Sequence, residues 1–148
     1  MKRLRKEGQN KLVSVTEIPV RFNEVDSLRV VWHGNYIKYF EDGREAFGEK
    51  YDLNYLDFYE KEGFVIPIIK MSCEHKKPLR YGEKAIIETS FVNTEAAKII
   101  FNYKIYRNTD KQLVAIGETV QVFLDGKGEL HLIAPLFFNE WKKRWGLL

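Results

Sequence analysis

Five segments of the chain carry the alternation of apolar and polar residues that is typical of half-buried β-strands. The clearest is 98–107, where one side holds Ile99, Phe101, Tyr103 and Ile105 and the other holds Asn102 and Lys104. We predict strands over residues 14–23, 64–73, 85–93, 98–107 and 113–124. The last four follow one another through turn-like segments, so we expect them to form an antiparallel meander. Pro19 indicates that the first strand is at a sheet edge or has a bulge, because proline has no backbone N–H to donate.

A helical repeat separates the first strand from the other four. Large side chains or glycine recur at steps of four, three and four residues, at Tyr36, Phe40, Gly43 and Phe47. This spacing predicts a long helix that begins at Tyr36 and ends near Gly48, with Asn35 as its N-cap. Glycine inside a helix costs about 1 kcal/mol relative to alanine, so Gly43 indicates close approach by another backbone.

These elements favour one architecture. Residues 54–61 are predicted to be a short helical or irregular piece, and 134–145 a terminal helix. A single long helix cannot cover both faces of such a sheet, so the sheet must curl around it. We therefore predict an α+β hotdog fold, in which a curved antiparallel sheet of five to six strands wraps around one long helix. Long apolar edge strands also favour self-association, so we expect a homodimer or homotetramer.

Composition limits the classes of function. The 148 residues are 45% hydrophobic and 30% charged, which is typical of one globular domain, predicted over residues 13–148. A single cysteine excludes an internal disulfide, and the three histidines are not at metal-ligand spacing, so we expect no metal. No apolar run approaches the roughly 20 residues that cross a bilayer, and no signal-peptide core is present. We expect a cytoplasmic protein without a membrane span.

The net charge of +3 is concentrated at the start of the chain. Residues 1–12 hold five basic residues and one glutamate, whereas the rest holds 19 basic and 20 acidic residues. A nucleic-acid-binding face would need a basic stripe on the folded part. We therefore expect no nucleic-acid partner, and we interpret residues 1–12 as a basic, poorly ordered arm.

The segment 20–47 resembles the opening of the 4-hydroxybenzoyl-CoA thioesterase-like acyl-CoA thioesterases. Their pattern is roughly R-[FY]-x-[DE]-x-D-x-x-G-V-V-x-[HY]-x-x-Y, followed by a helix with E-x-x-R. The matching residues are Arg21, Phe22, Glu24, Asp26, Val30, Val31, His33, Asn35, Tyr36, Glu41 and Arg44. One position departs from the pattern, because Arg29 stands where the family usually has glycine. This substitution bears on the backbone geometry of the loop and on substrate preference.

The resemblance implies that Asp26 faces the thioester carbon, where it either attacks or activates a water molecule. An independent argument agrees, since the loop carries this carboxylate toward helix N-terminal N–H groups that lack intrahelical partners. Those groups could hold an oxygen as it becomes anionic. The ordinary role of a loop aspartate, capping a turn, is the alternative.

The resemblance assigns the next residues to the same site. The backbone N–H of His33 would donate to the thioester oxygen, while its imidazole shapes the pocket or orients water. Gly34, Asn35 and Tyr36 are assigned to oxyanion or substrate binding. From the residues alone, Asn35 either caps the helix or holds the Asp26 side of the loop, and Tyr36 packs inside the sheet.

The function implied is an acyl-CoA thioesterase that needs no cofactor, with coenzyme A as part of the substrate. The alternative is a non-catalytic protein of the same fold that binds acyl thioesters as a scaffold. Glu41 is a weaker candidate for the catalytic carboxylate, because another branch of hotdog thioesterases uses a glutamate on this helix. Its spacing to Arg44 instead predicts a structural ion pair. Cys73 alternates with Met71 and is interpreted as core packing.

Overall fold

The computed structural model describes residues 12–148, so the predicted arm lies outside the described residues except for Leu12. The strands are β1 (Val13–Pro19), β2 (Ile68–His75), β3 (Lys84–Val92), β4 (Lys98–Arg107) and β5 (Leu113–Val122). The helices are α2 (Tyr36–Tyr51), α3 (Tyr55–Glu62) and α4 (Leu136–Arg144), with short 3-10 turns η1 (Phe22–Glu24) and η2 (His33–Asn35). Every predicted element is therefore present; β4 has the predicted ends, and the ends of the others differ by at most four residues.

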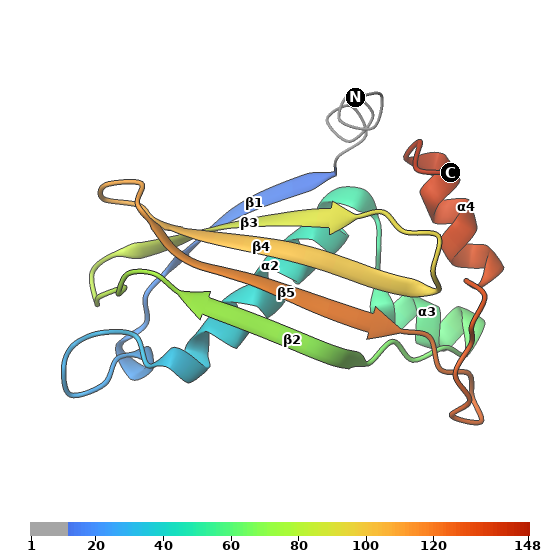
Figure 1. Cartoon of the computed structure of the whole chain (residues 1–148), viewed down its shortest axis with the longest axis horizontal. Coiled ribbons are helices and arrows are strands. Elements are labelled where there is room, and N and C mark those ends of the chain that lie inside the picture. The colour runs from blue at the N-terminus through green and yellow to red at the C-terminus, as the bar shows by residue number, and fades with distance from the viewer. Residues whose placement is uncertain (1–11) are drawn as a thin grey trace.

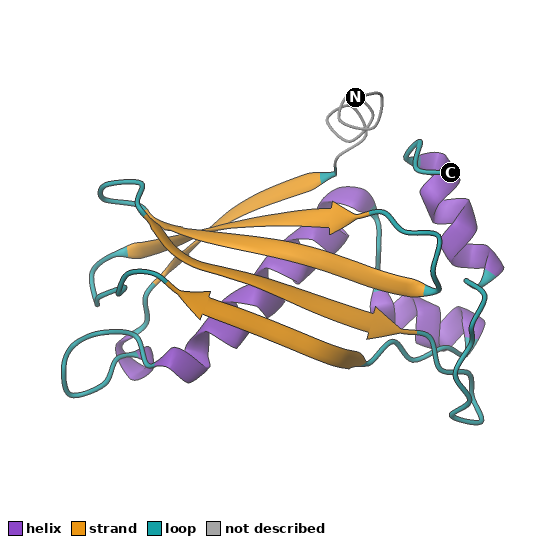
Figure 2. Ribbon diagram, viewed as in Figure 1, coloured by secondary structure: helices purple, strands orange, loops and turns teal. Residues whose placement is uncertain are grey.

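The strands form one antiparallel sheet in the order β1-β3-β4-β5-β2 (Figures 1 and 2). In the described residues the sheet has five strands, and β1 is at an edge, as Pro19 predicted. The prediction of a four-strand meander is wrong at β2, which pairs with β5 rather than with β3. The connection 76–83 is longer than the two-to-five-residue loop of a hairpin, so it does not require β2 to pair with β3.

The core lies between α2 and the inner face of the curved sheet (Figure 1). Phe40 stacks on Tyr103 of β4, with ring centroids 4.5 Å apart and planes at 18°. Gly43 is closely approached by another element, as predicted, but the prediction that a backbone approaches it is wrong, because the neighbours are side chains. A Cβ atom there would collide with Thr89 and Ile87 of β3, so glycine lets the helix lie directly on the sheet.

The helix covers only part of the inner face. It packs against β1, β3 and β4, while β2 forms the far edge of the sheet. The pairing register places Met71, Cys73 and His75 of β2 on the same face as α2. Met71 is 39% exposed, so this part of the inner face lies open beside the helix.

The opposite end of the core is closed by the C-terminal segment. The indole N–H groups of Trp141 and Trp145 both donate to the carbonyl of Tyr51, at 2.8 and 2.9 Å. Trp141 is almost fully buried, which fixes α4 against the end of α2. Among the described residues, no helix has the length and apolar character needed to cross a membrane.

Candidate active site

The 3-10 turn η2 leads directly into α2 and decides which backbone N–H groups remain free. The N–H of Asn35 donates to the carbonyl of Trp32 at 2.9 Å, and that of Tyr36 donates to the carbonyl of His33. The N–H groups of His33 and Gly34 donate to no other backbone group of the described residues. The free donors at this helix start are therefore two adjacent groups, at the positive end of the helix dipole.

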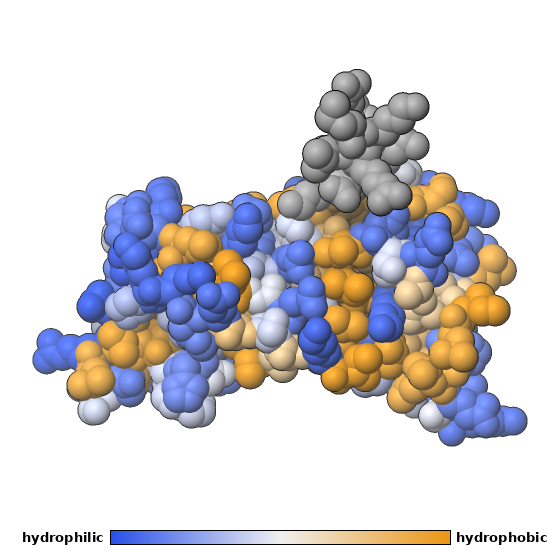
Figure 3. Space-filling model, in the orientation of Figure 1, coloured by the Kyte–Doolittle hydropathy of each residue, from blue (hydrophilic) through white to orange (hydrophobic). Residues whose placement is uncertain are grey.

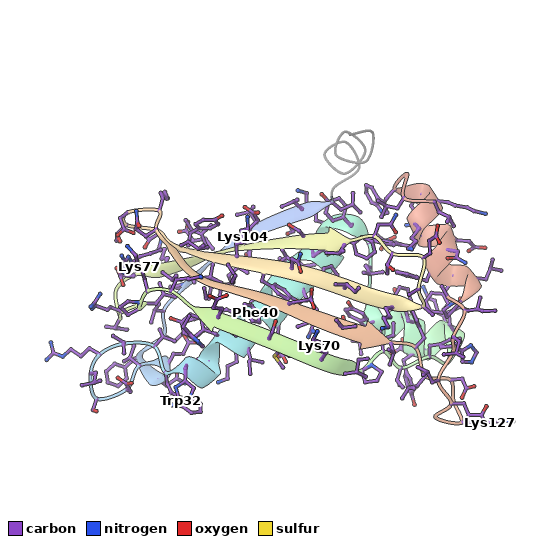
Figure 4. All side chains as sticks on the ribbon, viewed as in Figure 1. Trp32, Phe40, Lys70, Lys77, Lys104 and Lys127 are labelled. Carbon is purple, nitrogen blue, oxygen red and sulfur yellow. The ribbon has the colours of Figure 1, made fainter. Side chains whose placement is uncertain are left out.

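Trp32 covers this turn, at the start of α2 in Figure 4. A Cβ atom on Gly34 would collide with the Trp32 indole, so glycine is needed for the indole to lie against this backbone. The indole is 52% exposed, and its ring centroid lies 4.8 Å from that of His33. An exposed aromatic surface thus lies beside the two free N–H groups.

Asp26 lies in a tight hairpin between η1 and η2. Its backbone N–H donates to the carbonyl of Val30 at 2.9 Å, and its carbonyl accepts from the N–H of Arg29 at 2.9 Å. Its Oδ1 accepts from the N–H of Leu28 at 2.8 Å, so one carboxylate oxygen does cap the turn. The side chain is exposed, and the hydrogen bonds among the described residues leave Oδ2 unused.

The backbone conformation at Arg29 explains why the family pattern has glycine at this position. Its φ of 65° lies in the left-handed region, which costs a non-glycine residue about 1–2 kcal/mol. The hydrogen bonds of the hairpin hold this conformation despite the substitution. The loop therefore keeps a turn that suits glycine, and Arg29 adds an exposed cation to it.

Glu24 is the residue that joins this loop to α2, and it is 3% exposed. Its Oε1 accepts from the N–H of Arg21 at 2.8 Å and from the hydroxyl of Tyr39 at 3.0 Å. Its Oε2 accepts from Arg21 Nη1 at 3.0 Å. Burial, followed by the charge of Glu24, raises the pKa of Tyr39 far above its ordinary value. The sequence pattern contains Glu24 but did not reveal that it is the buried anchor.

The prediction that Asn35 caps α2 is wrong. Its φ of −80° and ψ of −14° are already helical, whereas an N-cap needs extended geometry, and its side chain makes no capping bond. The turn η2 is responsible, because it starts helical geometry two residues earlier. The Asn35 side chain instead donates from Nδ2 to the carbonyl of Glu24 at 2.9 Å, which is the loop-holding role.

Tyr36 packs inside the sheet, as predicted, and is 2% exposed. Its ring meets those of Tyr39 and His75 edge-on, at centroid distances of 5.8 and 4.6 Å. Burial raises the pKa of its hydroxyl, so Tyr36 is neutral at physiological pH. The side chain of Tyr36 therefore packs in the core next to the turn η2. Its contact with substrate stays a prediction.

His75 is a residue of this site that sequence reasoning missed. Its ring lies 6.5 Å from that of His33, and its Nε2 lies 3.7 Å from Sγ of Cys73. Cys73 is half-buried, and burial raises the pKa of its thiol, so it stays protonated at neutral pH. The available signal was the alternation that places Met71, Cys73 and His75 on one face, but β2 is far from η2 in sequence.

Glu41 and Arg44 do not form the predicted ion pair within the described structure. Glu41 is exposed, whereas Nη1 of Arg44 is buried without a hydrogen-bond partner. The guanidinium lies near Tyr55 and Tyr103 and partly offsets the effect of burial, which raises the pKa of Tyr103 to about 12. Glu41 and Arg44 instead line a cavity of about 480 Å³ beside α2 and α3.

One end of the molecule thus holds a carboxylate with a free oxygen and a helix start with two free N–H donors. A carboxylate can attack a carbonyl carbon or take a proton from water, and paired donors can hold the oxyanion that results. Among residues 12–148 no three His, Cys, Asp or Glu side chains gather as metal ligands.

Comparison with known proteins identifies the family. The model of the thioesterase-like superfamily matches residues 20–143. A Bacillus subtilis (strain 168) protein named "Putative acyl-CoA thioesterase YneP" is 37% identical over 94 residues, which cover 64% of this chain and 67% of that protein. The structure of DHNA-CoA thioesterase from Staphylococcus aureus matches with a TM-score of 0.80 and 26% identity, over 90% of this chain and 89% of that one.

The structure of 4-hydroxybenzoyl CoA thioesterase from Pseudomonas sp. strain CBS-3 has a TM-score of 0.77 and covers 87% of this chain and 98% of that one. At 22% identity this likeness concerns the fold alone. These matches confirm the predicted hotdog fold and the predicted family resemblance. Because the Bacillus subtilis relative and the Staphylococcus aureus neighbour are both named thioesterases, the predicted enzyme class, a thioester hydrolase, is confirmed as well. The chain belongs to the thioesterase-like superfamily.

Proposed function

We propose that this protein is an acyl-CoA thioesterase that uses Asp26 as its carboxylate and the N–H groups of His33 and Gly34 as its oxyanion donors. The observation that carries the proposal is the pair of free donors at η2, at the end of the molecule where the Asp26 carboxylate has a free oxygen. The relatives and neighbours named for CoA thioesters support the choice of substrate.

The reaction is R-CO-S-CoA plus water giving R-COOH and CoA-SH. A water oxygen bonds to the carbonyl carbon, the carbon–sulfur bond breaks, and the thiol carries away a proton. Asp26 either takes the proton of that water or attacks first and forms an anhydride, which water then hydrolyses. Both routes place negative charge on the thioester oxygen, where the two N–H groups would stabilise it. A thiol has a pKa near 8.5, so it leaves without metal or acid assistance.

We further propose that the working protein is a homodimer or homotetramer. The free edge of β2 and the open inner face beside it support self-association, because a second copy would cover Ile69 and Met71, which are 58% and 39% exposed. Light scattering at micromolar concentration should give at least twice the mass of one chain. A monomeric mass with intact activity would contradict a site that a second copy completes. The cytoplasmic location and the absence of a cofactor stay predictions.

A thiol-release assay tests the proposal. The purified protein should release CoA thiol, measured with a chromogenic thiol reagent, from at least one member of a panel of aliphatic and aromatic acyl-CoAs. Binding of acyl-CoA without thiol release from any member would favour the scaffold alternative. Neither binding nor release would contradict both functions.

A further inference from the structure

An exposed aromatic pair lies at the same end of the molecule as the candidate site and has no role in the core. The rings of Phe22 in η1 and Tyr81 in the β2–β3 loop meet edge-on, with centroids 5.8 Å apart. Phe22 is 77% exposed and Tyr81 is 58% exposed. Two large aromatic side chains held together in water offer ring faces to a flat ligand.

Several cations in the loops of this end have no acidic partner among the described residues, although Lys77 Nζ donates to Gln112 Oε1 at 3.0 Å. Arg29, Lys77, Arg80 and Lys111 have no carboxylate within 4.0 Å among the described residues, whereas Lys76, Lys84 and Arg107 are paired. Figure 4 shows Lys77 at this end, and Figure 3 shows apolar patches among hydrophilic residues there. A cation that already pairs with a carboxylate attracts a further anion less strongly. The four cations without a carboxylate partner are therefore the ones available to bind an anionic ligand.

Backbone contacts hold these loops together. Val30 pairs with Arg80 in an isolated antiparallel bridge, and the N–H of Val31 donates to the carbonyl of Leu79 at 2.8 Å. Arg107 Nη1 donates to the carbonyl of Pro78 at 2.9 Å, which ties the β2–β3 loop to the β4–β5 hairpin. The aromatic pair and the cations thus belong to loops that are fixed relative to one another and to the Asp26 hairpin.

We propose that Phe22, Tyr81 and Arg80, together with the neighbouring cations, form a subsite for the adenine nucleotide of coenzyme A. Adenine would stack on an exposed ring, and the phosphates would meet arginine and lysine. This inference rests on the proposed function, because it takes the substrate to be a CoA thioester. It adds a carrier preference, since an acyl-carrier-protein thioester has the pantetheine arm but no adenine. Acyl-CoA would therefore be the preferred substrate.

Tyr81→Leu tests the stack, with Tyr59→Leu on α3 as a control at a similarly exposed tyrosine (61%). Stacking of a base on an aromatic ring contributes roughly 5- to 150-fold in affinity, so Tyr81→Leu should raise the KM for acyl-CoA by that factor. Both variants should leave kcat/KM unchanged for the same acyl group on N-acetylcysteamine, which lacks the nucleotide. Arg80→Gln should raise the KM for acyl-CoA and weaken its dependence on salt.

Calorimetric titration with adenosine 3′,5′-bisphosphate tests the subsite without turnover. Wild type and Tyr59→Leu should bind it, and Tyr81→Leu should bind it more weakly. Binding by a protein that releases no thiol would retain the subsite and reject the proposed function, whereas thiol release without nucleotide binding would do the reverse. Equal effects of Tyr81→Leu on both thioesters would overturn the proposal. A change in oligomeric mass on Tyr81→Leu would also overturn it, since the pair would then be an interface between copies.

Discussion

Replacing Glu24 by glutamine tests the idea that one buried carboxylate fixes the Asp26 hairpin to α2. The substitution keeps the shape of the side chain but removes its charge and half of its acceptor capacity. Glu24 now accepts three hydrogen bonds, from the N–H and Nη1 of Arg21 and from the hydroxyl of Tyr39. The new amide would point N–H groups at donors, so at least one of these bonds must be lost.

The magnitude follows from the burial of each partner. The Arg21 side chain is 50% exposed, so its ion pair contributes at most about 1 kcal/mol. The Tyr39 hydroxyl has no access to water, and its hydrogen bond to a charged group contributes about 1.5–3 kcal/mol. We expect Glu24→Gln to lower the free energy of unfolding by about 2–3 kcal/mol, which for this chain length is about 6–12 °C in Tm.

Thermal and urea unfolding of four variants would measure this effect. Glu17→Gln is the matched control, because its carboxylate forms an exposed pair with Lys84 and should contribute less than about 0.5 kcal/mol. Tyr39→Phe removes the shared hydrogen bond, so Glu24→Gln should cost less in that background than in wild type. Additive effects of the two substitutions, or a Tm equal to that of Glu17→Gln, would refute the anchoring role.

Three further predictions address the core, the hairpin turns and pH. Gly43→Val should lower the free energy of unfolding by about 1–3 kcal/mol, because its side chain would enter the space of Ile87 and Thr89; a urea curve identical to wild type would contradict this packing. Arg29→Gly should change stability by less than about 1 kcal/mol, since relief of the left-handed strain offsets the greater freedom of unfolded glycine; a larger loss would show that the arginine side chain holds the loop. The Arg107 guanidinium holds the pKa of Asp110 at about 2, below its ordinary 3.8. The contribution of this ion pair to folding stability is therefore present above about pH 4 and is lost as the pH falls to 2; an NMR titration midpoint of Asp110 near 4 would contradict the pair.

The sequence predicted the elements well, because apolar periodicity records which face of each element is buried. Strand 98–107 and the start of α2 at Tyr36 matched the structure at the residue, and the close approach at Gly43 followed from its cost inside a helix. Strand order was harder. Periodicity shows that β2 is a strand but not which strand it pairs with, so its place beside β5 was not predictable from pattern alone.

The candidate site was only partly predictable for a similar reason. Local pattern located Asp26 and the helix start, which are near in sequence. It could not show that η2 moves the free N–H groups to His33 and Gly34 and takes Asn35 away from its capping role. Local pattern also could not predict that His75 lies beside His33, because that contact depends on the position of β2 at the sheet edge.

The catalytic role of Asp26 is tested most directly by the turnover of Asp26→Asn in the thiol-release assay. The variant keeps the size of the side chain and an oxygen that can accept from Leu28, so the hairpin should remain folded. A general base contributes about 10²–10⁴-fold, so kcat should fall by at least that order while KM changes little. Asp57→Asn on α3, where the carboxylate pairs with Lys61, should match wild type, as should Glu41→Gln. Wild-type turnover by folded Asp26→Asn, or loss of turnover in folded Glu41→Gln instead, would contradict the assignment.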